Sequence, residues 1–197
     1  YLGETLITGI GQGYIQSTPL QLTLMTAQLA NGGNKIYPTL TPNNKNVEEI
    51  KKEMELNEDL DLPSNYPPLV RNKENVKFVL DAMFKSTNEV YGTSYSSRIE
   101  DPKYQFAGKT GTAQVKRITE EERELDLKTE QIPYKQRDHS WYVAFGPYKD
   151  PRYAVSILVE HGGSGSSTAA PIAKKLFKFI IDRHELREQV KKKNLNN

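Results

Sequence analysis

The stretch HSWYVAFGPYKDPRYAVSILVE (residues 139–160) decides the fold, because it predicts two strands joined by a short turn. Aromatic and β-branched residues recur in both halves, residues 139–147 and 152–160, and the segment between them is rich in turn-forming residues. A connection this short joins neighbouring antiparallel strands, whereas parallel strands need a crossover of about a dozen residues or more. We therefore predict an antiparallel β-hairpin.

Helix signals precede this hairpin. Residues 18–33 begin with Thr18 and Pro19, place Gln21 where it can close a capping box, and end in a pair of glycines. Residues 72–90 carry apolar side chains at helical spacing, which predicts a second helix.

A last helix is predicted after the glycine- and serine-rich segment 161–167. Its expected apolar face consists of Ile172, Leu176, Phe179 and Ile180. Residues 185–197 are polar, and we expect this tail to fray. The order of helices, then strands, then a helix predicts an α+β domain with a mainly antiparallel sheet.

Composition excludes several classes of function. The 27 basic and 25 acidic residues leave a net charge of +2, which gives no reason to expect binding to nucleic acid or to an anionic membrane surface. The absence of cysteine excludes disulfides and thiolate metal ligands. His139, His161 and His184 lack the spacing of metal ligands, so neither a metal site nor a cofactor is predicted.

The segment FAGKTGTAQV (residues 106–115) offers the strongest chemical signal. A phosphate-binding P-loop would need glycine at position 103, where this chain has Lys103, so that interpretation fails. GIGQGY (residues 9–14) fails as a dinucleotide motif, because Tyr14 stands where the last glycine is required. Two interpretations of Lys109-Thr110-Gly111 remain from these residues alone, a turn and an exposed edge strand that binds a substrate.

The wider sequence resembles one family. AGKTGTAQV, then a charged excursion, then RDHSWYVAFGPYKDPRYAVSILVEHGGSGSSTAAPIAKKLF, is similar to the end of the transpeptidase domain of class B penicillin-binding proteins, most of all the elongation-type members. GIGQGYIQSTPLQLTLMTAQLANGG (residues 9–33) resembles the helical segment that precedes it in that family. The resemblance implies the C-terminal part of a penicillin-binding, serine β-lactamase-like domain over residues 1–197. Residues 116–138 would be a charged insertion, with a short helix over 119–127.

The resemblance also implies roles for the K-T-G strand. Lys109 would offer positive charge to the terminal carboxylate of a peptidoglycan stem peptide and, as a catalytic residue, help proton movement during acylation. Thr110 would hydrogen-bond the same carboxylate. Gly111 would leave room for the peptide, and the backbone N–H of Thr112 would be an oxyanion donor. Gln114 would line the groove or serve structure alone. Trp141 is interpreted as packing, and His139 as a residue at the rim.

The chain departs from the family at the nucleophile. No serine is followed by lysine three residues later, so the S-x-x-K motif is missing. Ser86-Thr87-Asn88 matches S-x-N in form, but we interpret it as the end of the second helix. We therefore expect the nucleophile and a membrane anchor to lie upstream, with the whole protein acylated by β-lactams at the periplasmic face of the bacterial inner membrane. A glycosyltransferase of the elongation machinery is the expected partner.

The chain by itself is expected to be inactive. Strand 152–160 would expose an unpaired apolar edge and favour self-association. Two alternative functions remain open: a non-catalytic β-lactam-sensing module, and a serine β-lactamase.

Overall fold

A three-stranded antiparallel sheet forms the centre of the structure, a computed structural model that describes residues 2–9, 11–36, 38, 69–116, 124–125 and 127–195, with side chains up to residue 189. The strands lie in the order β1-β2-β3. Their bounds are Ala107–Ala113 for β1, His139–Gly146 for β2 and Tyr153–Val159 for β3. The predicted hairpin is confirmed, since β2 and β3 pair antiparallel from Ser140↔Val159 to Gly146↔Tyr153.

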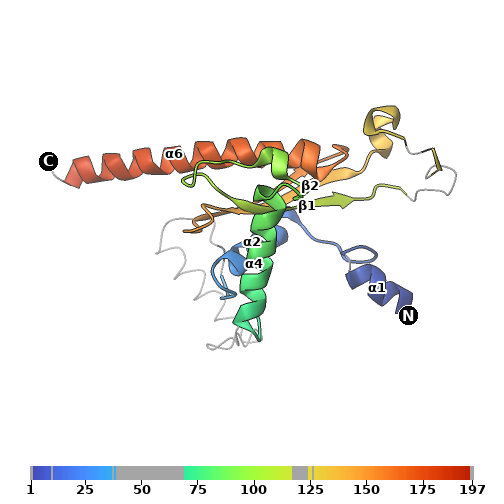
Figure 1. Ribbon diagram of the computed structural model, residues 1–197, viewed down its shortest axis with the longest axis horizontal. Coiled ribbons are helices and arrows are strands. Elements are labelled where there is room, and N and C mark those ends of the chain that lie inside the picture. The colour runs from blue at the N-terminus through green and yellow to red at the C-terminus, as the bar shows by residue number, and fades with distance from the viewer. Residues whose placement is uncertain are drawn as a thin grey trace, which may run out of the picture.

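Helices cover both faces of this sheet (Figure 1). Helix α6 (Ala170–Leu195) lies along one face, and α2 (Pro19–Ala30) and α4 (Lys73–Asn88) pack against the other. Helix α1 (Leu2–Gly9) lies apart from the sheet, and all its residues are exposed. The predicted α+β architecture is therefore confirmed as a layered arrangement of helix, sheet and helices.

Helices α2 and α4 begin as predicted. In α2 the Thr18 side chain accepts from the Gln21 N–H at 3.2 Å, while the Gln21 side chain accepts from the Thr18 N–H at 2.8 Å. Gly32 follows with a φ of 87°, the left-handed conformation that ends a helix. Helix α4 begins at the N-cap Asn72, whose side chain accepts from the Glu74 N–H at 2.8 Å.

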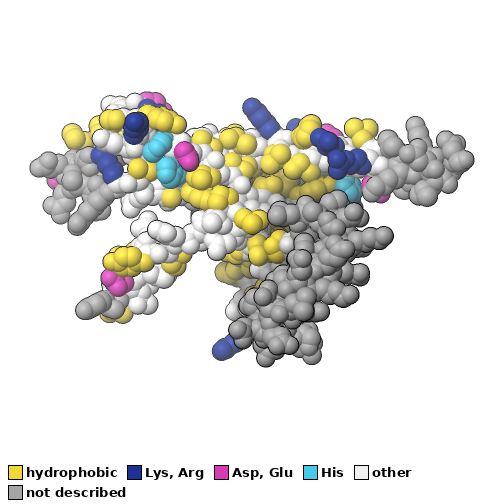
Figure 2. All heavy atoms as spheres, turned by 180° about the vertical axis from the view of Figure 1, so that it is seen from behind, with side chains coloured by type: hydrophobic (Ala, Val, Ile, Leu, Met, Phe, Trp, Pro, Cys, Tyr) yellow, Lys and Arg dark blue, Asp and Glu magenta, His cyan; other side chains and the backbone are white. Residues whose placement is uncertain are grey.

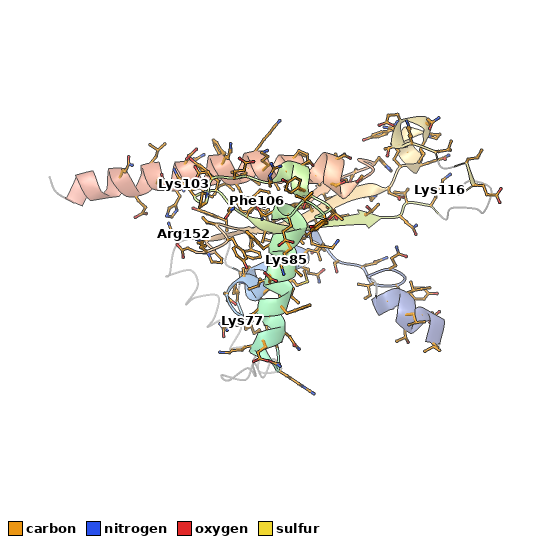
Figure 3. All side chains as sticks on the ribbon, viewed as in Figure 1. Lys77, Lys85, Lys103, Phe106, Lys116 and Arg152 are labelled. Atoms are coloured by element: carbon orange, nitrogen blue, oxygen red, sulfur yellow. The ribbon has the colours of Figure 1, made fainter. Side chains whose placement is uncertain are left out.

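Each face of the sheet has its own apolar core. Under α6, Phe106 is fully buried and stacks on Phe177, with ring centroids 4.9 Å apart (Figure 3 labels Phe106). Under α4, Met83 packs with Phe145 and Ala107. Because successive side chains of a strand point to opposite faces, β2 supplies both cores, with Tyr142 and Ala144 under α6 and Phe145 under α4.

The predicted apolar face of α6 was wrong by one residue position. Ile172 and Phe179 are exposed and Leu176 and Ile180 are half-buried, whereas the buried residues of the helix are Ala170, Ala173, Phe177 and Ile181. Small alanines at the contact let the helix approach the sheet closely, which a search for large apolar residues does not detect.

Helix α6 continues to Leu195, so most of the polar tail is helical, and its fraying stays a prediction. Its last turns are polar but rich in Glu, Lys, Arg and Gln, which are good helix formers that extend a helix already nucleated.

The charged insertion is described in part. The predicted helix over 119–127 falls largely outside the described residues. Two short 3₁₀ helices, Thr129–Gln131 and Tyr134–Gln136, lead into β2. None of the helices that the structure describes is both long and apolar enough to cross a membrane.

Candidate functional site

Strand β1 carries the K-T-G residues along an outer strand of the described sheet. Lys109 is exposed, and its Nζ donates to the carbonyl oxygen of Thr110 at 2.9 Å and approaches the Thr110 hydroxyl at 3.4 Å. Thr110 is half-buried, and Thr112 is exposed two residues further along the same edge. The structure therefore brings an ammonium and a hydroxyl together at a sheet edge, as the edge-strand interpretation requires and a turn would not.

The orientation of the backbone follows from one hydrogen bond. The N–H of Gly108 donates to the Thr87 hydroxyl at 3.0 Å, so it points away from β2. In an antiparallel pair, residues whose N–H and C=O face the neighbour alternate with residues whose groups face outward. Gly108, Thr110 and Thr112 pair with Ala144, Tyr142 and Ser140, so all three belong to the outward-facing set.

A side chain occupies one end of this outward-facing edge, because Thr87 of α4 takes the Gly108 N–H. Beyond it, Thr110 and Thr112 present outward-facing N–H and C=O groups within the strand, about 6.8 Å apart at the rise of a strand. The edge thus offers an extended peptide a short stretch for backbone pairing, with the Lys109 ammonium at one end.

A buried hydroxyl cluster holds the back of this strand. The Tyr142 hydroxyl lies 2.9 Å from the Thr87 hydroxyl and 3.0 Å from that of Ser94. All three residues are fully buried. Burial raises the pKa of Tyr142, while its hydroxyl partners act in the opposite direction.

Gly108 makes this cluster possible. A Cβ at Gly108 would lie 2.4 Å from the Tyr142 hydroxyl, so only glycine lets the tyrosine ring pass beneath β1. The phenol group therefore reaches across the strand to α4 and ties strand β1 to it.

The formal S-x-N triplet lies in the last turn of α4, as predicted, and each of its residues connects toward β1. Ser86 lies 3.3 Å from the Thr93 hydroxyl, Thr87 binds Gly108, and Asn88 Nδ2 donates to the carbonyl oxygen of Phe106 at 2.9 Å. The sequence analysis interprets this triplet only as the end of the second helix, and its part in anchoring the strand was missed. The signal in the sequence is the run of Ser and Thr residues at the end of that helix.

A π-helical turn, Gly165–Ala169, supports the strand from the α6 side. A Cβ at Gly165 would lie 2.4 Å from the Trp141 carbonyl oxygen and 2.7 Å from that of Gly111. The Ser140 hydroxyl donates to the Ser164 carbonyl oxygen at 3.0 Å and accepts from the Ala169 N–H at 3.2 Å, which fixes the turn on β2. Close contact on this side limits how far Gly111 can move.

A cavity opens where β1 ends, lined by residues of β1, of the insertion and of the segment after β3. The lining residues are Thr112, Lys116, Thr129, Ile132, Gln136, Arg137, Asp138, Gly163 and Ser164. Lys116 Nζ donates to Gln136 Oε1 at 2.9 Å. Figure 3 places Lys116 at the opposite end of the sheet from Lys103 and Arg152. Gln114, just beyond the strand, is exposed near this end.

His139 lies at the start of β2 and belongs to a histidine pair. Its Nδ1 accepts from the His161 N–H at 2.9 Å, and the two rings are 4.8 Å apart. Histidine side chains are also seen together at one end of the face in Figure 2. His161 has a φ of 54°, and its Nδ1 contacts the Arg137 carbonyl oxygen at 3.0 Å. These contacts give His139 a structural role in joining the ends of β2 and β3. Among the residues that the structure describes, no three acidic or histidine side chains form a metal-binding group.

Comparison with known proteins identifies the class that this fold and this edge define. A family model described as "Penicillin binding protein transpeptidase domain" matches residues 2–178, and the chain belongs to that family. Among its curated relatives is the peptidoglycan D,D-transpeptidase MrdA of Salmonella typhimurium (strain SL1344), 36% identical over 184 residues. That alignment covers 92% of this chain and 28% of MrdA, so the chain spans between a quarter and a third of the relative.

Comparison with solved structures identifies the same family. The chain is similar to PBP2 of Pseudomonas aeruginosa in complex with WCK 5153, with a TM-score of 0.62 and 36% identity over 88% of this chain and 32% of the other. It is also similar to PBP2 of Helicobacter pylori in complex with MreC, with a TM-score of 0.65 and 29% identity over 94% of this chain and 28% of the other. The expected family, its elongation-type branch and the transpeptidase fold are therefore confirmed.

Proposed function

We propose that this chain forms the substrate-binding edge of a peptidoglycan D,D-transpeptidase that acts on the D-Ala-D-Ala end of a stem peptide. One observation carries the proposal. On the outward-facing edge of β1, the Lys109 ammonium, the Thr110 hydroxyl and the outward N–H groups of Thr110 and Thr112 lie side by side. Similarity to MrdA and to the PBP2 structures supports the same activity.

Each residue of the edge has a proposed task. The terminal carboxylate of the substrate binds the Lys109 ammonium and the Thr110 hydroxyl, both of which donate hydrogen bonds to an anion. Gly111 leaves space for the peptide, and Gln114 lines the groove beyond. With the carboxylate at Lys109 and Thr110, the scissile carbonyl of an antiparallel peptide falls beside the outward N–H of Thr112. That N–H then stabilises the oxyanion, a contact often worth about 2.7–4 kcal/mol in the transition state.

The proposed reaction is serine acyl transfer, with the nucleophile carried outside these 197 residues. The serine oxygen attacks the carbonyl carbon of the penultimate D-Ala and forms an ester as the C–N bond breaks. The serine proton is transferred to the departing D-Ala amine. An amine of a neighbouring strand then attacks the ester, and the serine is regenerated. A β-lactam follows the first step only, because its opened ring stays attached.

Labelling with a fluorescent penicillin tests this function in the full-length protein. Lys109→Ala removes one charge-assisted hydrogen bond to the carboxylate, so we expect the labelling rate to fall about 10- to 100-fold. Lys77→Ala, on the exposed side of α4, is the matched control and should label like the unmodified protein. Equal labelling of Lys109→Ala would contradict the role given to Lys109.

The lifetime of the label, measured together with cross-linking of stem peptides, separates the two alternatives. A serine β-lactamase would release the label within minutes, because it must also activate a deacylating water. A non-catalytic sensor would keep the label but form no cross-linked product from stem peptides. We expect a stable label together with cross-linking.

We further propose that the 197-residue chain alone is inactive and self-associates through β3. This strand lies at the other end of the described sheet, and all seven of its residues are half-buried. An apolar strand with an open edge pairs readily with another chain. Sedimentation velocity over a range of concentrations should show growing oligomers. A monodisperse monomer that hydrolyses a chromogenic β-lactam would contradict both statements.

The proposed setting of the whole protein is the periplasmic face of the inner membrane, beside a glycosyltransferase of the elongation machinery. The family resemblance carries this assignment; similarity to the peptidoglycan D,D-transpeptidase MrdA supports a role in cell-wall synthesis, and the similar PBP2 of Helicobacter pylori was solved in complex with MreC. Crosslinking in intact cells followed by mass spectrometry should recover the glycosyltransferase. Its repeated absence, with the full-length protein present at native abundance, would argue against the partnership.

A further inference from the structure

Three side-chain hydroxyls form a hydrogen-bonded row that ends at the proposed carboxylate site. The Ser86 hydroxyl lies 3.3 Å from that of Thr93, and the Thr93 hydroxyl lies 3.2 Å from that of Thr110. This row of hydroxyls leads from the last turn of α4, through the loop that follows it, to β1. Thr93 is exposed and belongs to none of the motifs singled out in the sequence.

The backbone around Thr93 is fixed on both sides. A Cβ at Gly92 would lie 2.3 Å from the Ser86 carbonyl oxygen, so the loop turns tightly against the end of α4. On the other side, the N–H and the hydroxyl of Ser94 both donate to that same carbonyl oxygen at 3.0 Å. Thr93 is therefore held in place by its neighbours, and its own hydroxyl is left to serve the contact with Thr110.

Binding of a carboxylate decides which hydroxyl of the row donates and which accepts in each contact. A hydroxyl has one proton to donate and two lone pairs that accept. If Thr110 donates its proton to a carboxylate, its contact with Thr93 requires Thr93 to be the donor. Thr93 can then accept from Ser86. Hydrogen bonds aligned in one direction polarise one another, so the Thr110 hydroxyl becomes a better donor toward the anion.

The distances fit a site that tightens when occupied. Contacts of 3.2 and 3.3 Å are long for paired hydroxyls, which usually lie 2.7–2.8 Å apart. Such hydrogen bonds are often long before the ligand binds and shorten in the complex.

We propose that Thr93 is a positioning residue for Thr110, which orients the Thr110 hydroxyl and strengthens it as a donor to carboxylate-bearing ligands. The inference rests on the proposed function, because it assumes that Thr110 binds the carboxylate of the stem peptide or of a β-lactam. Thr93 itself touches neither the substrate nor the reacting atoms.

The test compares two ligands in the full-length protein. Acylation rates are measured for a fluorescent penicillin with a free carboxylate and for the same compound with that carboxylate capped as a methyl ester. Thr93→Val removes the hydroxyl at nearly constant shape, so the rate with the free carboxylate should fall about 3- to 10-fold while the rate with the ester stays unchanged. Thr93→Ser restores the hydroxyl and should restore the rate.

The acylation rates of the Thr93 variants separate the ways in which the inference could be wrong. An equal fall with both ligands would mean that Thr93 only supports the loop, and would overturn the inference. Unchanged rates in Thr93→Val would overturn it as well, while leaving the proposed function intact. Thr93→Ala removes the hydroxyl without a β-branched side chain and must give the same ratio as Thr93→Val. If the unmodified protein were not acylated by the free penicillin at all, the proposed function itself would fail.

Discussion

The two outer strands of the described sheet, β1 and β3, differ in what they offer to a neighbour. Strand β1 begins with two buried residues, and among the residues that follow Lys109 and Thr112 are exposed. Strand β3, YAVSILV, is apolar apart from its tyrosine and one serine, and every residue is half-buried. The edge of β1 is suited to a polar ligand that binds and leaves, and the edge of β3 is suited to permanent contact with another protein segment.

The supports behind the two strands differ in the same way. Behind β1, the hydroxyls of Thr87, Ser94 and Tyr142 satisfy one another and the Gly108 N–H. In β3, the buried hydroxyl of Ser156 has no hydrogen-bond partner among the described residues. A strand that binds a ligand must keep its position while empty, and directional hydrogen bonds achieve this better than apolar packing alone.

The largest effect is expected from filling the space at Gly108. Gly108→Val would drive its side chain into the Tyr142 ring, and the buried cluster has no room to yield, so we expect a loss of about 3 kcal/mol or more in unfolding free energy. Urea unfolding followed by the fluorescence of Trp141, the single tryptophan, measures it at concentrations below the onset of association. Stability within 0.5 kcal/mol of the unmodified chain, an order-of-magnitude threshold for a surface change, would show that β1 is not held as described.

The next largest effect concerns the hydroxyl of Thr87. Thr87→Val leaves the Gly108 N–H and the Tyr142 hydroxyl without this partner, which should cost about 2 kcal/mol. Thr23→Val is the matched control, because its hydroxyl donates only to the Pro19 carbonyl oxygen in its own helix and lies at the surface. Equal losses of unfolding free energy in the two variants would show that a hydroxyl joining two elements stabilises the fold no more than one that bonds within its own helix.

Strand β3 should respond with the opposite sign. Ser156→Ala removes a buried hydroxyl that has no described partner, so we expect a gain of up to about 1 kcal/mol. Ser94→Ala deletes the same group from the cluster behind β1 and should instead lose about 1 kcal/mol. Denaturation curves with losses in both variants would refute the comparison of the two strands.

The smallest effect is expected from the exposed ion pairs between α6 and the segment before β1. The Tyr104 hydroxyl donates to Asp182 at 2.6 Å and Lys103 Nζ approaches it at 3.2 Å, and both lower the pKa of Asp182. Because the folded pKa lies below the ordinary value of 3.8, the stabilisation is present above about pH 4 and is lost as the pH falls through the folded pKa.

Thermal unfolding between about pH 5 and pH 2 tests this pair. The unmodified chain should lose slightly more stability on acidification than Asp182→Asn, since exposed pairs contribute little and are screened by salt. Parallel curves for the two proteins would show that the contact contributes nothing.

The sequence was sufficient where local signals and family motifs agreed. Thr18, Pro19 and Gln21 marked the start of α2, and the short turn after residue 146 required the hairpin. The position of Lys109 and Thr110 on an outer strand followed from that hairpin and the motif together.

The missed features depend on contacts between distant segments. Thr87 and Tyr142 are 55 residues apart, so no local pattern links their hydroxyls. The buried face of α6 was misassigned because Ala173 contributes by being small, and its importance appears only when the sheet lies against it.

The alternation along β1 has a consequence for amide exchange. The N–H groups of Lys109 and Gly111 face β2 within the ladder, while those of Thr110 and Thr112 face outward. In the empty protein, hydrogen–deuterium exchange should therefore be slow and fast at successive residues. A peptide or β-lactam on the edge would slow only the fast set, so occupancy of the site could be followed at two backbone amides without any label on the ligand.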